Sequence, residues 1–244
     1  MNSDAIPELH APDGSFPALG FGTWQLKGDT ARQAVTAALA AGYRHIDTAR
    51  MYQNEKEVGE AIANSPMPRE DIFLTTKIFN DSLDAESVHK EMDRSLADLG
   101  TEYVDLLLIH WPARDVPLSE TLEAMDELKQ QGKTRHVGVS NFTVRLLKET
   151  LQASPGPIFC NQVEYHPFLG QDKLLSYCRS QNIPLVAYSP LAKGKALDNP
   201  VLRDIAEIHG KNPAQIVIRW LLHQDGVGLI PRSSNPDHIR ANID

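Results

Sequence analysis

The chain has 244 residues, 41% of them hydrophobic, and a formal net charge of −8. This length and composition favour one ordered domain with a sizeable core and argue against a disordered chain. The acidic balance disfavours non-specific nucleic-acid binding, and no apolar run approaches the roughly 18 residues of a membrane span.

Apolar runs of strand length alternate with segments of helical period along the chain, without a linker or a low-complexity stretch. This alternation predicts a single domain over residues 1–244. The opening heptapeptide MNSDAIP lacks a targeting signal, which predicts a cytoplasmic protein. The eight predicted strands cover residues 19–23, 43–47, 72–77, 104–110, 136–140, 158–164, 184–189 and 227–231.

Residues 9–19 precede these strands and contain the dipeptide Asp13-Gly14 between short mixed segments. This pattern predicts a small β-hairpin over one end of the domain. Two of the helical segments stop at glycine, at Gly42 and Gly100, as helices often do.

Three asparagines carry signals for a helix start. Asn54, with Glu57 three residues later, resembles a capping box. Asn199-Pro200 and Asn212-Pro213 each read as an N-cap followed by proline at the first helical position. Two helices are therefore predicted between the seventh and eighth strands.

Eight strands that alternate with helices favour an α/β fold closed as a (β/α)₈ TIM barrel over an open, doubly wound sheet. A dinucleotide-binding turn of the open-sheet type needs a GxGxxG motif after its first strand. The first strand here reads LGFGTW and lacks the third glycine. An open sheet is therefore the weaker prediction.

Polar residues gather at the carboxyl ends of the predicted strands, where a barrel places its active site. Taken singly, each has an ordinary explanation: Asp47 as a turn residue, Lys77 as a snorkelling side chain, His110 as a core histidine and Tyr52 as a packed ring. Four such coincidences at one barrel mouth are less probable than one shared site. The strand-end residues are Asp47, Lys77, His110, Ser140, Asn141, Gln162, Glu164, Tyr188, Ser189, Arg232 and Ser233.

These residue types suit the delivery of a proton to a carbonyl group. The Tyr52 phenol has a reference pKa near 10, and a nearby Lys77 ammonium would favour the phenolate and lower that pKa. Asp47 would hold the lysine charged, while His110 would hydrogen-bond a substrate oxygen. Such a site needs an electron source. The two cysteines, Cys160 and Cys178 in the printed sequence, lack metal-ligand spacing, so we expect buried thiols, no metal and a bound nicotinamide.

The ordered motifs DTARMYQNEKEVG, TTK, DLLLIHWP, GVSNF, NQVEYHPFL, YSPLAKGK and IPRSS resemble the aldo-keto reductase superfamily over nearly the whole chain. Within the superfamily the chain is similar to the small bacterial 2,5-diketo-D-gluconate and methylglyoxal reductases. The resemblance implies that Asp47, Tyr52, Lys77 and His110 form the catalytic tetrad, with Tyr52 as the general acid.

The same resemblance implies an NADPH site and a small-molecule carbonyl substrate. Tyr188 would stack on the nicotinamide, and the segment 189–195 would lie along the pyrophosphate. The implied cofactor-binding residues are Gly22, Thr23, Trp24, Ser140, Asn141, Gln162, Tyr188, Ser189, Leu191, Lys193, Arg232, Ser233, Ser234, His238 and Asn242. The implied substrate-binding residues are Trp24, Tyr52, Phe79, His110 and Trp111.

Two departures bear on these implications. His238 stands where many relatives place an arginine, and Ala241 replaces a common acidic residue, so the preference for NADPH over NADH rests mainly on Arg232. The chain also stops at Asp244, early in the last predicted helix, whereas relatives continue into a C-terminal tail that lines the substrate pocket. The sequence is thus either part of a longer protein or that of an enzyme with an open pocket.

Two other functions stay open on the sequence alone. The superfamily's resemblance to potassium-channel β-subunits allows a non-catalytic NADP-binding regulator. A barrel aldolase that forms a Schiff base through Lys77 is chemically possible, although pairing with Asp47 would keep the amine charged. The predicted function is that of a cytoplasmic NADPH-dependent carbonyl reductase, with a monomer expected from the resemblance and neither nucleic acid nor membrane as a partner.

Overall fold

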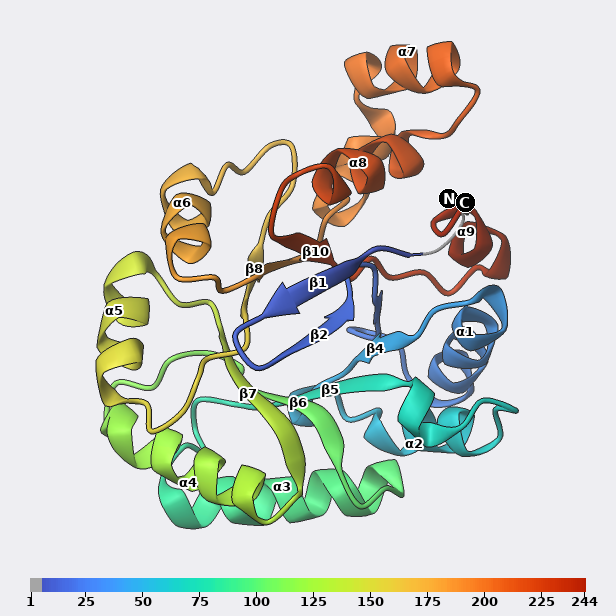
Figure 1. The fold of residues 1–244 in the computed structure, drawn as a ribbon. Coiled ribbons are helices and arrows are strands. Elements are labelled where there is room, and N and C mark those ends of the chain that lie inside the picture. The colour runs from blue at the N-terminus through green and yellow to red at the C-terminus, as the bar shows by residue number, and fades with distance from the viewer. Residues whose placement is uncertain (1–5) are drawn as a thin grey trace.

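The computed structural model describes residues 6–244, so most of the opening heptapeptide used to predict localisation lies outside the described residues. Within them, eight parallel strands form one curved sheet in the order β10-β9-β8-β7-β6-β5-β4-β3 (Figure 1). The strands are β3 Phe21–Gly22, β4 His45–Asp47, β5 Phe73–Ile78, β6 Val104–Ile109, β7 Thr134–Ser140, β8 Asn161–Glu164, β9 Leu185–Tyr188 and β10 Val227–Leu229. All eight predicted strands are confirmed, with ends that differ by a few residues.

Hydrogen bonds between the two ends of the sheet close the barrel. Gly20 donates its N–H to the Leu229 carbonyl at 2.9 Å, and the Leu229 N–H donates to Ala18 at 2.8 Å. The close approach needs a glycine, because a Cβ on Gly22 would lie 2.8 Å from the Ile230 carbonyl oxygen. The predicted (β/α)₈ barrel is confirmed.

Helices cover the outside of the sheet (Figure 1). The α-helices are α1 Gly28–Ala41, α2 Glu55–Ala63, α3 Ala85–Leu99, α4 Leu118–Gln130, α5 Val144–Ala153, α6 Asp172–Ser180, α7 Pro200–His209, α8 Pro213–Leu222 and α9 Pro236–Ala241. Short 3₁₀ helices cover η1 Arg50–Tyr52, η2 Arg69–Asp71 and η3 Ala192–Asp198. Helices α1 and α3 end at Gly42 and Gly100 in the left-handed conformation, as predicted. Among the described residues, no helix has the length and apolar character that a bilayer crossing requires.

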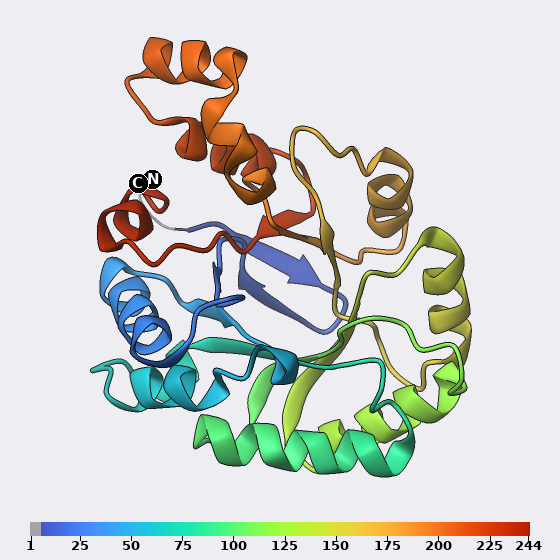
Figure 2. The ribbon, with the colours of Figure 1, turned by 180° about the vertical axis from the view of Figure 1, so that it is seen from behind.

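The predicted helices between the last two strands are α7 and α8, and α7 lies at the periphery in both views (Figure 2). Asn199 caps α7 by accepting the Leu202 N–H. Asn212 caps α8 in a full capping box with Gln215, in which each side chain binds the other residue's backbone.

The capping box predicted at Asn54 is wrong. Asn54 precedes α2, but its side chain makes no cap hydrogen bond. It is fully buried instead, accepts the Thr48 hydroxyl at 2.7 Å, and donates to the Thr23 and Leu26 carbonyls at 2.9 and 3.0 Å. A buried amide meets more partners in the loops after β3 and β4 than it would at an exposed helix end.

The predicted hairpin covers the base of the barrel, the end at which the strands begin. It consists of β1 Glu8–Ala11 and β2 Gly14–Pro17, so the two turn residues are Pro12 and Asp13, one position earlier than the predicted dipeptide. Phe16 is buried, and its ring lies 5.5 Å from Phe73 and 5.1 Å from Phe159 between centroids. The hairpin therefore fills one end of the barrel, which leaves the other end for chemistry.

Candidate active site

The four residues predicted to share a site do converge at the mouth of the barrel, the end at which the strands finish. Asp47 ends β4, Lys77 lies in β5, and His110 follows β6 directly. Tyr52 is the last residue of η1, the single helical turn between β4 and α2. Neighbouring parallel strands thus bring three of the side chains together, and the loop after β4 supplies the fourth.

Lys77 has all three ammonium hydrogens within reach of an acceptor. Its Nζ lies 2.5 Å from Asp47 Oδ1, 2.8 Å from the Thr48 carbonyl oxygen and 3.4 Å from the Tyr52 hydroxyl. Burial alone would lower the lysine pKa, but the Asp47 and Tyr52 oxygens outweigh burial and raise it. A charged lysine is a poor nucleophile, so the geometry disfavours the Schiff-base aldolase.

The second carboxylate oxygen of Asp47 is also occupied. Gln162 donates its Nε2–H to Asp47 Oδ2 at 2.8 Å, and both side chains are almost completely buried. Gln162 was predicted to contact a nicotinamide, and this additional link to Asp47 could not be read from the sequence. With both oxygens held, the carboxylate presents one fixed orientation to Lys77.

The expected net lowering of the Tyr52 pKa is not what the structure gives. Burial at the mouth raises the pKa of the phenol, Lys77 lowers it, and the negative charge of Asp47 raises it again, so the net direction is upward. The sequence identified the Lys77 contribution correctly but could not show how deeply the hydroxyl is buried. The phenol is therefore held protonated, the form that a general acid requires.

His110 is held between two aromatic rings at the mouth. Its ring meets Tyr52 and Phe79 edge-on, with centroid distances of 5.5 and 5.6 Å. Burial and the Lys77 charge lower the pKa of its imidazole to about 3. Its Nδ1 is buried without a hydrogen-bond partner among the described residues. The imidazole is therefore neutral near pH 7 and engages the protein through packing.

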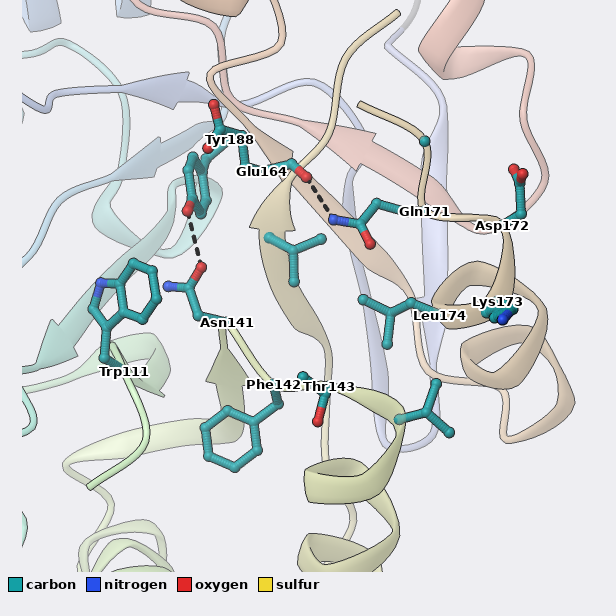
Figure 3. Close-up of a pocket in the computed structure, with 13 residues that line it drawn as sticks. Trp111, Asn141, Phe142, Thr143, Glu164, Gln171, Asp172, Lys173, Leu174 and Tyr188 are labelled. Atoms are coloured by element: carbon teal, nitrogen blue, oxygen red, sulfur yellow. Dashed lines mark hydrogen bonds between the residues drawn. The ribbon is translucent and has the colours of Figure 1, made fainter. Parts of the chain in front are cut away.

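Asn141 connects the strands on the far side of the mouth, where Ser140 and Gln162 also lie. Its Nδ2 donates to the His110 carbonyl at 2.9 Å, and its Oδ1 accepts the Tyr188 hydroxyl at 2.9 Å (Figure 3). Its backbone φ of 65° is left-handed, which asparagine tolerates better than most residues. Ser140 donates to the Gln162 carbonyl at 2.8 Å. The predicted nicotinamide-binding residues are thus one connected group, while their role stays a prediction.

A pocket of about 500 Å³ adjoins this group on the side of β7 and β8. Trp111, Asn141 and Tyr188 lie together on one side of it, and Gln171, Asp172 and Lys173 lie on the opposite side (Figure 3). Thr143 and Glu164 also line it. The sequence did not single out Thr143, Gln171 or Lys173. Thr143 and Gln171 directly precede α5 and α6, and Lys173 lies in the first turn of α6, so their only signal was their place after the fifth and sixth predicted strands.

The residues predicted to bind the phosphates of the cofactor lie in the loops after β9 and β10. Ser189 and Lys193 have left-handed φ angles of 48° and 55°, and the exposed Lys193 ammonium lies 5.8 Å from the Trp24 ring centroid. The exposed Arg232 donates to the Gln25 side chain at 3.0 Å. Lys193 and Arg232 give this side of the mouth the positive charge that phosphates need.

The other cofactor residues predicted after β9 and β10 range from exposed to buried. Ser234 and His238 are exposed, and Leu191 and Ser233 are half-buried. Asn242 is 7% exposed at the end of α9, so its side chain is largely enclosed by protein. Within residues 6–244, no group of three or more His, Cys, Asp or Glu is placed to hold a metal ion.

The chain is similar in sequence to proteins of one known family. The model of a family described as "Aldo/keto reductase family" matches residues 18–244. An aldo-keto reductase of Mycolicibacterium smegmatis is 43% identical over 98% of this chain and 87% of its own length. Methylglyoxal reductase DkgB of Escherichia coli O157:H7 is 39% identical over 94% of this chain and 86% of its own length.

A solved structure agrees with these matches. The crystal structure of a putative 2,5-diketo-D-gluconic acid reductase B superposes with a TM-score of 0.96 at 40% identity. The superposition covers 98% of this chain and 85% of that one. The resemblance inferred from the motifs, including its bacterial branch, is confirmed.

Proposed function

Since the chain belongs to the aldo/keto reductase family, we propose that it reduces small aldehydes, ketoaldehydes or diketo sugars to alcohols with NADPH. The observation that carries the proposal is the buried chain of contacts from Gln162 through Asp47 and Lys77 to the Tyr52 hydroxyl. A protonated phenol beside a fixed ammonium suits the protonation of a carbonyl oxygen.

The residues at the mouth fit a nicotinamide dinucleotide by their chemistry. Ser140, Asn141 and Gln162 would bind the carboxamide, since each carries a hydroxyl or an amide, and the Tyr188 ring offers an apolar face. Lys193 and Arg232–Ser234 would bind the phosphates, as positive charge and hydroxyls do elsewhere. When bound, NADPH supplies a hydride.

In the proposed reaction the carbonyl carbon gains the hydride and the carbonyl oxygen gains a proton from Tyr52. His110 would orient that oxygen through Nε2–H, because a proton on the buried and unpartnered Nδ1 would have no acceptor. The Lys77 ammonium would stabilise the phenolate left on Tyr52. Asp47 and Gln162 keep the ammonium in place throughout.

The aromatic side chains at the mouth support the proposed substrate class. Trp24 and Trp111 are 38% and 43% exposed, so both rings are available to a ligand, and Phe79 is half-buried beside His110. Flat apolar walls around two hydrogen-bond donors suit a small carbonyl compound. The names of the methylglyoxal and 2,5-diketo-D-gluconic acid reductases point to the same class.

The test is NADPH oxidation with methylglyoxal and with 2,5-diketogluconate, by the wild-type protein and a Tyr52→Phe variant, with NADH in parallel. We expect turnover in the wild type and a kcat lower by about 100-fold or more in the variant, the usual contribution of a general acid. Tryptophan fluorescence should still report NADPH binding by the variant. Equal turnover in both proteins would contradict the role of Tyr52, and NADPH binding without turnover of any carbonyl would favour the regulator.

A further inference from the structure

Tyr52 lies on a very short element, and a charged residue holds the beginning of that element. The 3₁₀ turn η1 contains only Arg50, Met51 and Tyr52. The Arg50 guanidinium donates to Glu55 at 2.9 Å. It also donates to two acids of α3, to Glu91 at 3.2 Å and to Asp98. The start of the turn is thereby fixed to the two helices that flank it.

The Glu55 carboxylate extends this connection to the strand that carries Lys77. Glu55 is 2% exposed, and its second oxygen accepts the Thr76 hydroxyl at 2.6 Å. Thr76 directly precedes Lys77 in β5, and successive side chains of a strand point to opposite faces. The contact therefore holds the helix-facing side of β5 at Thr76, one residue before Lys77 projects into the barrel.

We propose that Arg50 and Glu55 are positioning residues, which set the separation between the Tyr52 hydroxyl and the Lys77 ammonium from outside the barrel. The proposal rests on the proposed function of Tyr52. Neither residue touches the hydroxyl or the ammonium, so each acts through the backbone of η1 or β5. The separation they set is the 3.4 Å between Lys77 Nζ and the Tyr52 oxygen.

Replacing Arg50 with a neutral residue should displace η1, because three acidic side chains surround the guanidinium. Glu55, Glu91 and Asp98 all contact its guanidinium, and the hydrogen-bonded carboxylates of Glu55 and Asp98 outweigh burial and raise the pKa of Arg50. Without the guanidinium, the buried Glu55 carboxylate would keep, among the described residues, only the Thr76 hydroxyl as a partner. The Glu55 carboxylate would then be repelled by those of Glu91 and Asp98, and η1 would lose its contacts with α2 and α3, so the turn should move away from β5.

The end of η1 has an independent restraint, which limits how far Tyr52 can move when Arg50 is replaced. Lys27 donates its ammonium to the Tyr52 carbonyl oxygen at 2.5 Å. Tyr52 also donates its own N–H to Ala49 at 2.9 Å. We therefore expect Tyr52 to be displaced and not released when Arg50 is replaced.

A matched ion pair at the base of the barrel provides the control. Arg69 donates to Asp105 at 2.9 Å, and Asp105 also accepts the Leu74 N–H in β5. The side chains of this pair are 20% and 4% exposed, against 29% and 1% for Arg50 and Glu55. Both pairs fix a buried acid to β5, but only the pair at the mouth adjoins Tyr52.

The experiment compares Arg50→Met, Arg50→Lys and Arg69→Met with the wild type. For Arg50→Met we expect kcat to fall about tenfold with KM unchanged, because displacements near 1 Å cost up to about 100-fold in rate. Arg50→Lys keeps the charge and should recover part of the loss. Arg69→Met should lower the midpoint of urea unfolding without lowering kcat. An equal fall in kcat for Arg50→Met and Arg69→Met, or none for Arg50→Met, would overturn the proposal.

The titration of Tyr52 gives a readout that does not depend on turnover. In tyrosine labelled with ¹³C at Cζ, the Tyr52 signal is assigned as the one lost in Tyr52→Phe. Lys77 lowers the pKa of the phenol, so a greater separation in Arg50→Met should raise that pKa, and Arg69→Met should not change it. An unchanged pKa in Arg50→Met would overturn the positioning role even if the proposed function fails.

Discussion

At the base of the barrel, Phe16 of the hairpin packs against Phe73 and Phe159, and the three rings fill the space between the strands. At the mouth, the equivalent central position is taken by the ion pair of Lys77 and Asp47. A buried ion pair contributes less to stability than apolar side chains of similar volume. The base therefore contributes mainly to stability, whereas the mouth keeps a charged pair that contributes little to stability and that the proposed function would use.

The backbone shows the same contrast. Loops at the base take left-handed φ angles mainly at glycine, which adopts them without strain. In residues 6–244 those glycines are Gly42, Gly100, Gly132 and Gly226, joined by Asn182. Loops at the mouth take this conformation at Gly28 and Gly194, but also at six residues with side chains, namely Gln25, Gln53, Asn141, Ser189, Ala192 and Lys193. Left-handed residues that carry side chains, and the backbone strain that comes with them, are thus more frequent at the mouth than at the base.

The largest effect should come from breaking the ion pair at the mouth. In Lys77→Met, Asp47 stays buried without its ammonium, so we expect a loss of about 3–5 kcal/mol in the free energy of unfolding together with loss of turnover. The double variant Asp47→Leu/Lys77→Met should regain the stability and stay inactive. Urea unfolding and NADPH oxidation measure both quantities.

The control for this comparison is Phe16→Ala at the base. It should lose about 3–5 kcal/mol through a cavity, while kcat per folded molecule stays at the wild-type value. A wild-type stability in Lys77→Met, or a fall in kcat of the folded Phe16→Ala protein, would remove the distinction between the two ends.

A smaller effect on stability is expected at acidic pH, through His110 at the mouth. The folded pKa of His110 is lowered to about 3, so between this value and the ordinary 6.5 only the unfolded state binds the proton. Stability therefore falls as the pH drops through this window, by ~2 kcal/mol between about pH 6.5 and 5. Urea unfolding at both pH values should show this loss in the wild type and not in a His110→Gln variant.

The comparison of the two proteins is needed because burial also lowers the pKa of His45 at the base. His45 adds to the acid loss of both proteins, so only the difference between them reports His110. Parallel curves for the wild type and His110→Gln would show that the imidazole is not held neutral in the folded state.

The smallest changes in stability should come from substitutions at residues with left-handed φ angles. Gly100→Ala at the base should lower the free energy of unfolding by about 1–2 kcal/mol through strain alone, because no atom of residues 6–244, apart from the adjacent residues, lies within 4 Å of the added Cβ. Lys193→Gly at the mouth should change stability by less than about 1 kcal/mol, in the stabilising direction. The midpoints of thermal unfolding measure both changes. A destabilised Lys193→Gly would show that its left-handed backbone is not strained.

The sequence predicted the parts of the molecule that depend on local pattern. Apolar runs indicated the eight strands, and the rule that barrel sites lie at strand ends indicated Asp47, Lys77 and His110. Tyr52 was indicated by its place in the short segment between Asp47 and the next predicted helix, and the family motif added its role as the general acid. The Asn-Pro helix starts at Asn199 and Asn212 were predictable for the same local reason.

What the sequence missed depends on partners far apart in the chain. Asn54 resembled a helix cap because Glu57 follows it, yet the partners that determine its orientation lie in two other loops. The link from Gln162 to Asp47 joins residues of β8 and β4. The net direction of the Tyr52 pKa depends on burial, which no spacing rule reports.

The closing of the barrel also has a consequence for how the protein is made. Strand β3 near the amino end must hydrogen-bond to the region around Leu229 near the carboxyl end. During synthesis, this contact cannot form until the segment through Leu229 has emerged, so until then one side of β3 is an unpaired sheet edge. β3 spans only Phe21 and Gly22, and such a short edge gives other nascent chains little to pair with.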